Sequence, residues 1–320
     1  MKRIFKVFLV AAFLMTTATA NAGPAKISIS QFVEHPALNA INKGFKDDLQ
    51  ENGVATEYKD YNANGNMGTA GQIATQIVAD APDLIVAIAT PTAQACAKSY
   101  EKAPQLAQTP MLFTGITDPL AAGLVKDLAH PGPNITGVSN QMPMEKHLEM
   151  LRRVLPKLTN LGVLYNSGEV NSVSNVKRLK EAAAKMNITV LDGPVTNSAD
   201  VFQAAQSLVG KVDALFVPTD NTVVSALEAV IKVCERTKLP LFSADTDSVK
   251  RGSIAAMGLD YYQHGKQTGA MARKILAGAK PEALPVEFQK ELVFHVNPKA
   301  AERMGLNLDK AIIDSANTLY

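Results

Sequence analysis

Short apolar runs alternate with longer amphipathic stretches along most of the chain. The apolar runs are bounded by turn residues, which is typical of buried β-strands. In the stretches between them, apolar residues recur three or four positions apart, as on one face of a helix. Predicted strands cover residues 25–30, 55–61, 83–89, 110–116, 134–140, 160–166, 188–193, 213–219, 239–245 and 252–258, and predicted helices include 36–51, 68–80, 92–100 and 144–155. This alternation predicts an α/β fold with parallel sheets covered by helices on both faces.

The two halves of this pattern also resemble each other. A run that starts at Asp83 ends in Thr-Pro-Thr, and a run that starts at Asp213, 130 positions later, ends in Pro-Thr-Asp-Asn-Thr. Residues 109–123 match residues 238–252 at nearly the same spacing. Two matches in the same order predict two similarly built lobes. Since ligands of open parallel sheets bind beyond the carboxyl ends of the strands, two facing lobes predict a cleft lined by strand ends.

The first 22 residues follow a different pattern, that of a secretory signal peptide. Lys2, Arg3 and Lys6 precede a short apolar core at 7–15, and residues 20–22 form a small-residue cleavage site. The alternative is a membrane anchor, but the apolar stretch is shorter than the about 20 residues that a spanning helix needs. No cysteine follows the cleavage site, which argues against a lipid anchor. We therefore expect a mature protein that starts at Gly23 and works outside the cytoplasm.

Charge and cysteine content narrow the possible partners. Without residues 1–22, which carry three basic and no acidic residues, the formal net charge changes from +2 to about −1. A near-neutral chain without a basic block argues against nucleic acid or an anionic membrane as partner. Cys96 and Cys234 lie in different halves of the sequence, and both a pair of buried free thiols and a single disulfide remain open.

Several blocks of the sequence resemble one family. Residues 29–53, ISQFVEHPALNAINKGFKDDLQENG, are similar to the opening of the substrate-binding components of ABC transporters with the type I fold. Their most specific motif is Glu34-His35-Pro36-Ala37-Leu38. The blocks GQIATQIVADAPDLIVAIATPTAQA, PMLFTGITDPLAAGLV, NITGVSN and FHVNPKAAERMGLNL match later parts of the family. More narrowly, the chain resembles the subfamily that includes tryptophan- and aromatic amino-acid-binding members.

The resemblance implies an architecture and a role. The expected fold is that of type I periplasmic binding proteins, with two Rossmann-like lobes joined by a three-strand hinge. Lobe 1 would hold residues 23–139 plus about 262–285, and lobe 2 residues 140–260 plus about 286–320. The expected crossings lie near 139–140, 259–260 and 285–288. The implied protein is a periplasmic monomer that passes a small-molecule ligand to an ABC permease in the inner membrane and needs no cofactor or metal.

The candidate binding residues are mostly small and polar and follow the predicted strands. They are Gln31, Phe32, Glu34, Ala89, Thr90, Thr92, Thr114, Gly115, Asp118, Tyr165, Asn166, Thr219, Asp220, Asn221 and Asp245. For an amino-acid ligand, we expect Thr90, Thr92 and Thr114 to bind the carboxylate, Asp220, Asp245 or Glu34 the ammonium, and Phe32 and Tyr165 a flat side chain. These loops contain no Arg or Lys, which disfavours phosphate and dicarboxylate ligands.

Many of these residues also have a purely structural interpretation. Threonines 90 and 92, Glu34, Asp220 and Asn221 are suitable helix caps, and Asp118 before a proline is a good turn residue. His35 precedes Pro36, so we interpret it as a residue held in extended geometry. The hypothesis of a binding site depends on six strand ends carrying small polar residues, which is more than capping requires.

Catalytic motifs are missing from the sequence. The five histidines are isolated, without HExxH or HxH spacing, and no GxSxG, GxGxxG or Walker A run occurs. We therefore expect a binding protein and not an enzyme, with a secreted small-molecule hydrolase as the alternative. A sensor module for a membrane receptor is a further alternative, because it needs the same two-lobed clamp. Aromatic or branched amino acids are the leading ligand candidates, followed by a small neutral heterocycle such as a pyrimidine.

Overall fold

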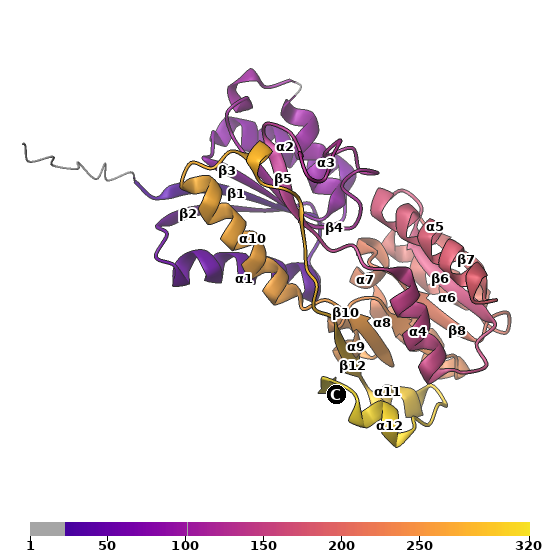
Figure 1. The fold of residues 1–320 in the computed structure, drawn as a ribbon. Helices are drawn as coiled ribbons and strands as arrows, with labels where there is room; N and C mark the ends of the chain where they lie inside the picture. The colour runs from indigo at the N-terminus through magenta and orange to yellow at the C-terminus, as the bar shows by residue number, and fades with distance from the viewer. Residues whose placement is uncertain (1–22, 101) are drawn as a thin grey trace, which may run out of the picture.

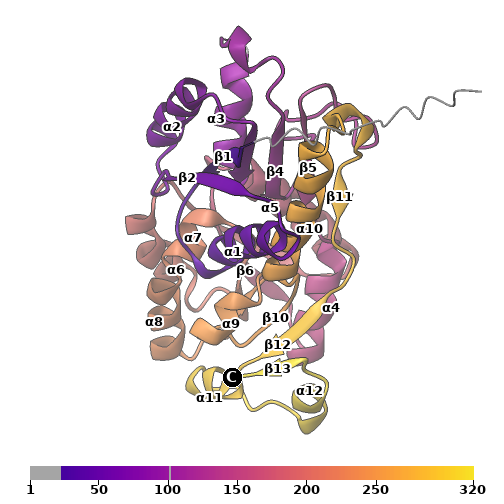
Figure 2. The same ribbon diagram turned by 90° about the vertical axis from the view of Figure 1, so that its left-hand side faces the viewer.

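The computed structural model describes residues 23–100 and 102–320, so the predicted signal peptide lies outside the described residues. Figures 1 and 2 show two α/β lobes, each built around one sheet. Two separate apolar cores, one for each sheet, are buried between the sheets and their helices. The α/β fold with two lobes predicted from the alternating pattern is confirmed.

The first sheet is parallel throughout its described strands. Its strand order is β11 (Glu287–Phe288), β5 (Ile135–Ser139), β4 (Met111–Ile116), β3 (Leu84–Ile88), β1 (Ala25–Gln31) and β2 (Thr56–Asn62). The helices of this lobe are α1 (Pro36–Glu51), α2 (Met67–Asp80), α3 (Thr90–Tyr100) and α10 (Tyr261–Leu276), with short 3₁₀ turns η1 (Pro104–Leu106) and η3 (Pro281–Ala283). The central strand β3 is completely buried because helices cover both faces of the sheet.

The second sheet has the order β13 (Thr318–Leu319), β12 (Val293–Val296), β10 (Ala255–Gly258), β9 (Leu241–Ser243), β8 (Ala214–Val217), β6 (Asn160–Asn166) and β7 (Thr189–Val195). Around it lie α4 (Met144–Val154), α5 (Val170–Lys185), η2 (Ser198–Asp200), α6 (Val201–Leu208), α7 (Asn221–Ser225), α8 (Leu227–Thr237), α9 (Asp247–Arg251), α11 (Pro298–Arg303) and α12 (Lys310–Asp314). This sheet departs from the expected all-parallel arrangement, because β12 runs antiparallel to β10.

The chain passes between the sheets after β5, after β10 and after β11. The first two passages lie at the expected positions, near 139–140 and 259–260. The third lies later than expected, because Val286 belongs to the first core and Phe288 pairs with Ser139 of β5. Residues 286–288 are therefore part of the first sheet and its core, and not of the second lobe. The remaining boundaries of the lobes as folding units stay a prediction.

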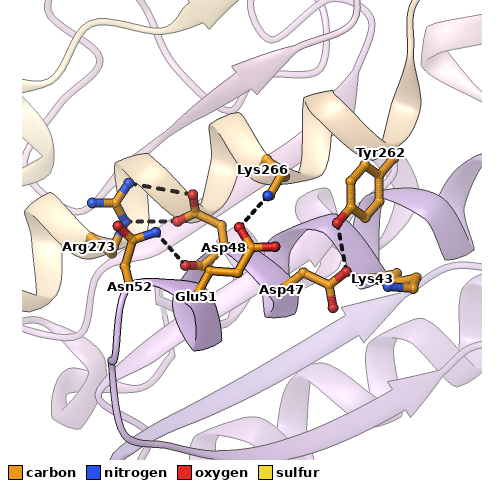
Figure 3. Close-up of polar contacts among 8 residues, drawn as sticks. All are labelled: Lys43, Asp47, Asp48, Glu51, Asn52, Tyr262, Lys266 and Arg273. Carbon is orange, nitrogen blue, oxygen red and sulfur yellow. Dashed lines mark hydrogen bonds and ion pairs between the residues drawn. The ribbon is translucent and has the colours of Figure 1, made fainter.

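Helix α10 returns from the second sheet to pack along α1, as both views of the ribbon show (Figures 1 and 2). Glycines allow this close approach: an added Cβ at Gly44 would lie 2.1 Å from the carbonyl oxygen of Tyr262. Polar pairs flank the contact (Figure 3), including Arg273 Nε to Asp48 Oδ2 at 2.8 Å. The tight packing fixes the N-termini of α1 and α10 relative to each other, and both helices begin at the space between the lobes.

The two cysteines are free and buried, Cys96 in α3 and Cys234 in α8. They lie in different apolar cores, so the structure contains two free thiols and not the disulfide that the sequence left open. Among the described residues, we find no helix that is both long and apolar enough to span a membrane.

Candidate functional site

A cavity of about 360 Å³, counted with the part that is open to solvent, lies between the two lobes. Its walls are the N-termini of α1, α7 and α10 and the loops after β4 and β9. The lining residues are His35, Ala37, Leu38, Gly115, Thr117, Asn140, Asn171, Thr219, Asp220, Asn221, Val224, Asp245 and Tyr261. Residues of both lobes therefore line this space. We call it the central cavity.

Asp220 provides a buried carboxylate in the wall of the central cavity. As the N-cap of α7, its Oδ1 accepts a hydrogen bond from the backbone N–H of Val223 at 2.7 Å. Its Oδ2 accepts from the backbone N–H of Asn166 at 2.5 Å and from the Ser172 hydroxyl at 2.6 Å. Burial, together with the nearby carboxylate of Glu169, raises the pKa of Asp220 to about 7.

Glu169, the N-cap residue of α5, brings a second buried carboxylate to the N-terminus of α7. Its Oε1 accepts from the backbone N–H and the hydroxyl of Thr222, at 3.1 and 2.8 Å. Its Oε2 accepts from the backbone N–H of Asn221 at 3.3 Å and from the side-chain amide of Asn171 at 3.3 Å. Two carboxylates thus meet beside a cavity that no Lys or Arg lines, and this arrangement favours a cationic group of a ligand.

Asp245 brings a third carboxylate to the cavity from the loop after β9. Its two oxygens accept from the backbone N–H of Ser248 at 2.8 Å and from the Ser248 hydroxyl at 2.7 Å. The side chain is buried, and burial raises the pKa of Asp245 above its ordinary value. The residue therefore combines a structural role at the start of α9 with a position in the cavity wall.

The hinge side of the cavity is formed by Asn140 and Tyr261. Asn140 follows β5, and its amide Nδ2 donates to the hydroxyl of Tyr261 at 3.3 Å. Tyr261 is the first residue of α10 and is 5% exposed. Both residues are anchored in the first lobe, Tyr261 in its apolar core and Asn140 through its backbone N–H to the carbonyl of Ile116. The Tyr261 ring gives the cavity a flat aromatic wall.

Three cavity side chains have a buried polar atom without a partner in the described chain. The atoms are His35 Nδ1, Asn140 Oδ1 and Asn171 Oδ1, and the residues are 8%, 7% and 4% exposed. Burial lowers the pKa of His35 to about 4, so its imidazole is neutral at pH 7. Because buried polar atoms in proteins are nearly always hydrogen-bonded, these three atoms mark the cavity as a place for a polar ligand.

A second, larger hollow of about 960 Å³ lies between the lobes on the side of β2 and β7. It is lined by the loops after β1, β2, β6 and β7 and shares Asn221 with the central cavity. Its walls include the side chains of Phe32, Asn66, Asn166 and Asn197. We call this hollow the outer cavity.

The structure brings together five of the predicted site residues around the central cavity. These are Gly115, Thr219, Asp220, Asn221 and Asp245. Phe32 and Asn166 line the outer cavity instead. Gln31 and Glu34 line a shallow hollow beside Lys43 and Asp60 on the first lobe.

The other predicted residues lie away from the central cavity, each for a local reason. The Thr92 hydroxyl donates to the carbonyls of Ile88 and Ala89, and the Thr114 and Thr268 hydroxyls are hydrogen-bonded at 2.8 Å. Thr90 and Ala89 are buried at the β3–α3 junction, Tyr165 packs against the core of the second lobe, and Asp118 bonds to Ser174. Thr90, Thr92 and Thr114 thus do not line the central cavity. The binding roles of the fifteen residues stay predictions.

Sequence reasoning did not select several residues that line the central cavity: His35, Ala37, Leu38, Thr117, Asn140, Asn171, Val224 and Tyr261. His35 precedes Pro36 and was therefore given only a conformational role. Its position after a strand end and at the start of a helix is itself a signal for a site residue. Asn140 and Tyr261 lie at the predicted crossings, where a residue faces both lobes. In the part of the chain that the structure describes, no group of three or more His, Cys, Asp or Glu side chains is arranged for a metal ion.

Comparisons with known proteins show the family of the chain. Residues 26–319 match the family model described as ABC transporter substrate binding protein. A curated relative from Clostridioides difficile, named tyrosine-binding protein, is 39% identical over 294 residues, which are 88% of this chain and 82% of the relative.

Two solved structures are also similar. An ABC domain from Streptococcus pneumonia in complex with L-Trp is 33% identical, with a TM-score of 0.87 over 93% of this chain and 100% of that one. The ligand-free, open structure of a substrate-binding protein with adhesive properties from Clostridium difficile is 38% identical. The match covers 92% of this chain and 98% of that one, with a TM-score of 0.68.

Proposed function

We propose that this chain, which belongs to the ABC transporter substrate-binding protein family and has the type I periplasmic binding fold, captures an amino acid with an aromatic side chain. The ligand would bind in the central cavity and be passed to an ABC permease in the inner membrane. Proteins of this family are extracytoplasmic, and we place this one in the periplasm as a monomer. It acts by binding alone, without chemistry on the ligand.

The composition of the central cavity carries the proposal. Asp220 and Asp245 line it and no Lys or Arg does, so it suits a ligand with a positive group and no excess negative charge. A zwitterionic amino acid meets this condition. The Tyr261 ring and the side chains of Leu38 and Val224 provide the apolar surface that a flat side chain needs. Two similar proteins, named for tyrosine and solved with L-Trp, have ligands of this class.

The arrangement of the lobes supports a clamp that closes around its ligand. Identity is higher to the open, ligand-free relative than to the L-Trp complex, at 38% against 33%. The TM-score has the opposite order, 0.68 against 0.87. Sequence divergence does not explain this reversal, whereas a closed placement of the lobes does. The hinge is formed by the three passages between the sheets, and closure of this kind is a known mode of ligand capture.

Calorimetric titration of the purified protein with L-tyrosine, L-tryptophan, L-phenylalanine and L-leucine tests the proposal. The chain has no Trp, so the fluorescence anisotropy of added L-tryptophan is a second, independent readout. We expect saturable one-to-one binding of the aromatic amino acids and a raised melting temperature in their presence. Glucose serves as the control ligand, since other proteins of this fold bind sugars. Failure of all three aromatic amino acids to bind would falsify the proposal.

A further inference from the structure

Helix α1 begins at the central cavity, and no side chain caps its N-terminus. His35 is the N-cap residue, and its side chain makes no capping hydrogen bond. Pro36 has no N–H, so the first free donors of the helix are the backbone N–H groups of Ala37 and Leu38. Neither donates to any described residue, and the first backbone bond of the helix is Asn39 N–H to the carbonyl of His35. Both residues line the cavity and are buried, at 2% and 4% exposure.

Two other helices that begin at the cavity, α7 and α10, have an N-cap side chain that accepts from their backbone. In α7, Asp220 accepts from the N–H of Val223, and Glu169 accepts from those of Asn221 and Thr222. In α10, the Asp260 side chain accepts from the N–H of Gln263. Helix α1, sixteen residues long, has no such cap, and its positive end faces this cavity with the free N–H groups of Ala37 and Leu38.

An independent observation marks the same place. His35 Nδ1 is buried, has no partner in the described chain and belongs to a residue that lines the cavity. Buried backbone N–H groups are almost always paired, so the two free N–H groups require a partner with acceptor atoms. The neutral His35 ring adds a third donor in the tautomer that carries its proton on Nδ1. A carboxylate has two acceptor oxygens and the charge that a helix N-terminus attracts.

We propose that the backbone N–H groups of Ala37 and Leu38, together with His35, form the subsite that holds the α-carboxylate of the ligand. This inference rests on the proposed function, in which the ligand is an amino acid. It assigns the carboxylate to α1 and not to Thr90, Thr92 and Thr114 of the sequence prediction. The carboxylates of Asp220 and Asp245, which also line the cavity, remain for the ammonium.

Ligands that lack the carboxylate test the subsite directly. Tyramine and tryptamine keep the ring and the ammonium of L-tyrosine and L-tryptophan but have no carboxylate. In calorimetric titrations of the unchanged protein, we expect each amine to bind at least 100-fold more weakly than its amino acid. If the amines bind as well as the amino acids, the carboxylate subsite is wrong while the proposed function stands. If neither amino acid binds, the proposed function fails and the subsite fails with it.

The variant His35→Asp gives a second test, because it should change stability and binding in opposite directions. Aspartate is a strong N-cap, so its carboxylate takes the free N–H groups of α1 and adds negative charge there. We expect a melting temperature without ligand that is equal or higher, and an affinity for L-tryptophan at least 100-fold lower. The same variant should bind tryptamine at least as well as the unchanged protein does, because the repelled carboxylate is missing from that ligand.

Two variants control for charge and for capping. Asn66→Asp adds the same charge at the N-cap of α2, which is exposed and outside the central cavity, and should leave the affinity for L-tryptophan within about threefold. His35→Asn caps α1 without a charge and should weaken binding less than His35→Asp. Unchanged L-tryptophan binding in a folded His35→Asp protein would overturn the subsite, as would an equal loss for L-tryptophan and tryptamine.

Discussion

The hydroxyl of Ser174 donates a hydrogen bond of 2.8 Å to Oδ2 of Asp118. Ser174 belongs to α5 beside the second sheet, and Asp118 follows β4 of the first, so this bond joins the two lobes. A few residues away, the hydroxyls of Thr117 and Thr219 lie 3.3 Å apart, again one from each lobe. Thr117 and Thr219 also line the central cavity, so these contacts hold the lobes together on one side of it.

Loss of the Ser174 hydroxyl should loosen the closed arrangement. Because the bond to Asp118 joins the lobes, Ser174→Ala removes about 1 kcal/mol from the closed form and leaves the open form nearly unchanged. We expect L-tryptophan to bind about threefold to tenfold more weakly, mainly through faster dissociation, which stopped-flow fluorescence measures. Ser207→Ala is the matched control, because that hydroxyl bonds only to Ala204 of its own helix. Equal dissociation rates in both variants would show that the contact does not stabilise closure.

The raised pKa of Asp220 predicts how stability depends on pH. Its pKa is about 7 in the folded protein against an ordinary value of 3.8, so the folded state keeps a proton that the unfolded state loses. The stability from this group is complete below about pH 4 and is lost as the pH rises through 7. The buried histidines 35, 147 and 264, whose pKa is lowered to about 4, change the stability in the opposite direction between pH 4 and 6.5. The decline from Asp220 is therefore measured as the difference between the unchanged protein and Asp220→Asn in thermal melts without ligand from pH 4 to 8.

Ligand binding should reverse this effect, because an ammonium next to Asp220 and Glu169 favours the ionised carboxylate. The rise in melting temperature produced by L-tryptophan is therefore expected to grow between pH 5 and 8. Binding near pH 6.5 should release protons, which titration in two buffers of different ionisation enthalpy detects. Proton uptake, or no proton exchange, would contradict the assignment of the ammonium to this side of the cavity.

Thr90 is expected to be dispensable for binding, against its prediction from the sequence. Its hydroxyl is buried and has no partner in the described chain, and the residue does not line the central cavity. Thr90→Val keeps the shape and removes the unpaired polar atom, so we expect an unchanged affinity for L-tryptophan and an equal or slightly higher melting temperature. Calorimetry and a thermal melt check both parts. A loss of affinity above tenfold would restore Thr90 as a ligand contact.

The regular elements were predictable because local signals determine them. The helix from Pro36 has a proline at its first position and Asn52-Gly53 after its end, and the structure places α1 at Pro36–Glu51. Apolar strands such as 160–166 have the predicted bounds because both faces of the sheet are covered. The antiparallel strand β12 was missed, since nothing in its four residues indicates the direction of pairing.

The site was predicted less completely, because strand ends indicate a region and not the direction of each side chain. Thr92 follows β3 and Thr114 lies near the end of β4. The Thr92 hydroxyl, however, bonds to the neighbouring backbone, and the Thr114 hydroxyl bonds to Thr268. Asn140 and Tyr261 were missed because their contact forms only when β5 and α10 pack in the same lobe. Such contacts join residues 121 positions apart, beyond the reach of a local pattern.

The close packing of α1 on α10 predicts opposite effects for two glycine substitutions. At Gly44, an added Cβ would lie 2.1 Å from the backbone oxygen of Tyr262, so Gly44→Ala must push the helices apart. We expect it to lower the free energy of unfolding by at least the about 1–3 kcal/mol that overpacking costs. At Gly71, an exposed position in α2, an added Cβ meets nothing within 4 Å.

Gly71→Ala should therefore raise the free energy of unfolding by about 0.5–1 kcal/mol, since alanine loses less backbone entropy in a helix. Urea unfolding followed by circular dichroism measures both variants. Gly44→Ala should also weaken L-tryptophan binding, because the shift moves His35 at the start of α1 relative to Tyr261 at the start of α10, and both line the cavity. Equal stability of the two variants would mean that the helices can separate without cost, and would remove the packing argument for how the cavity is held in shape.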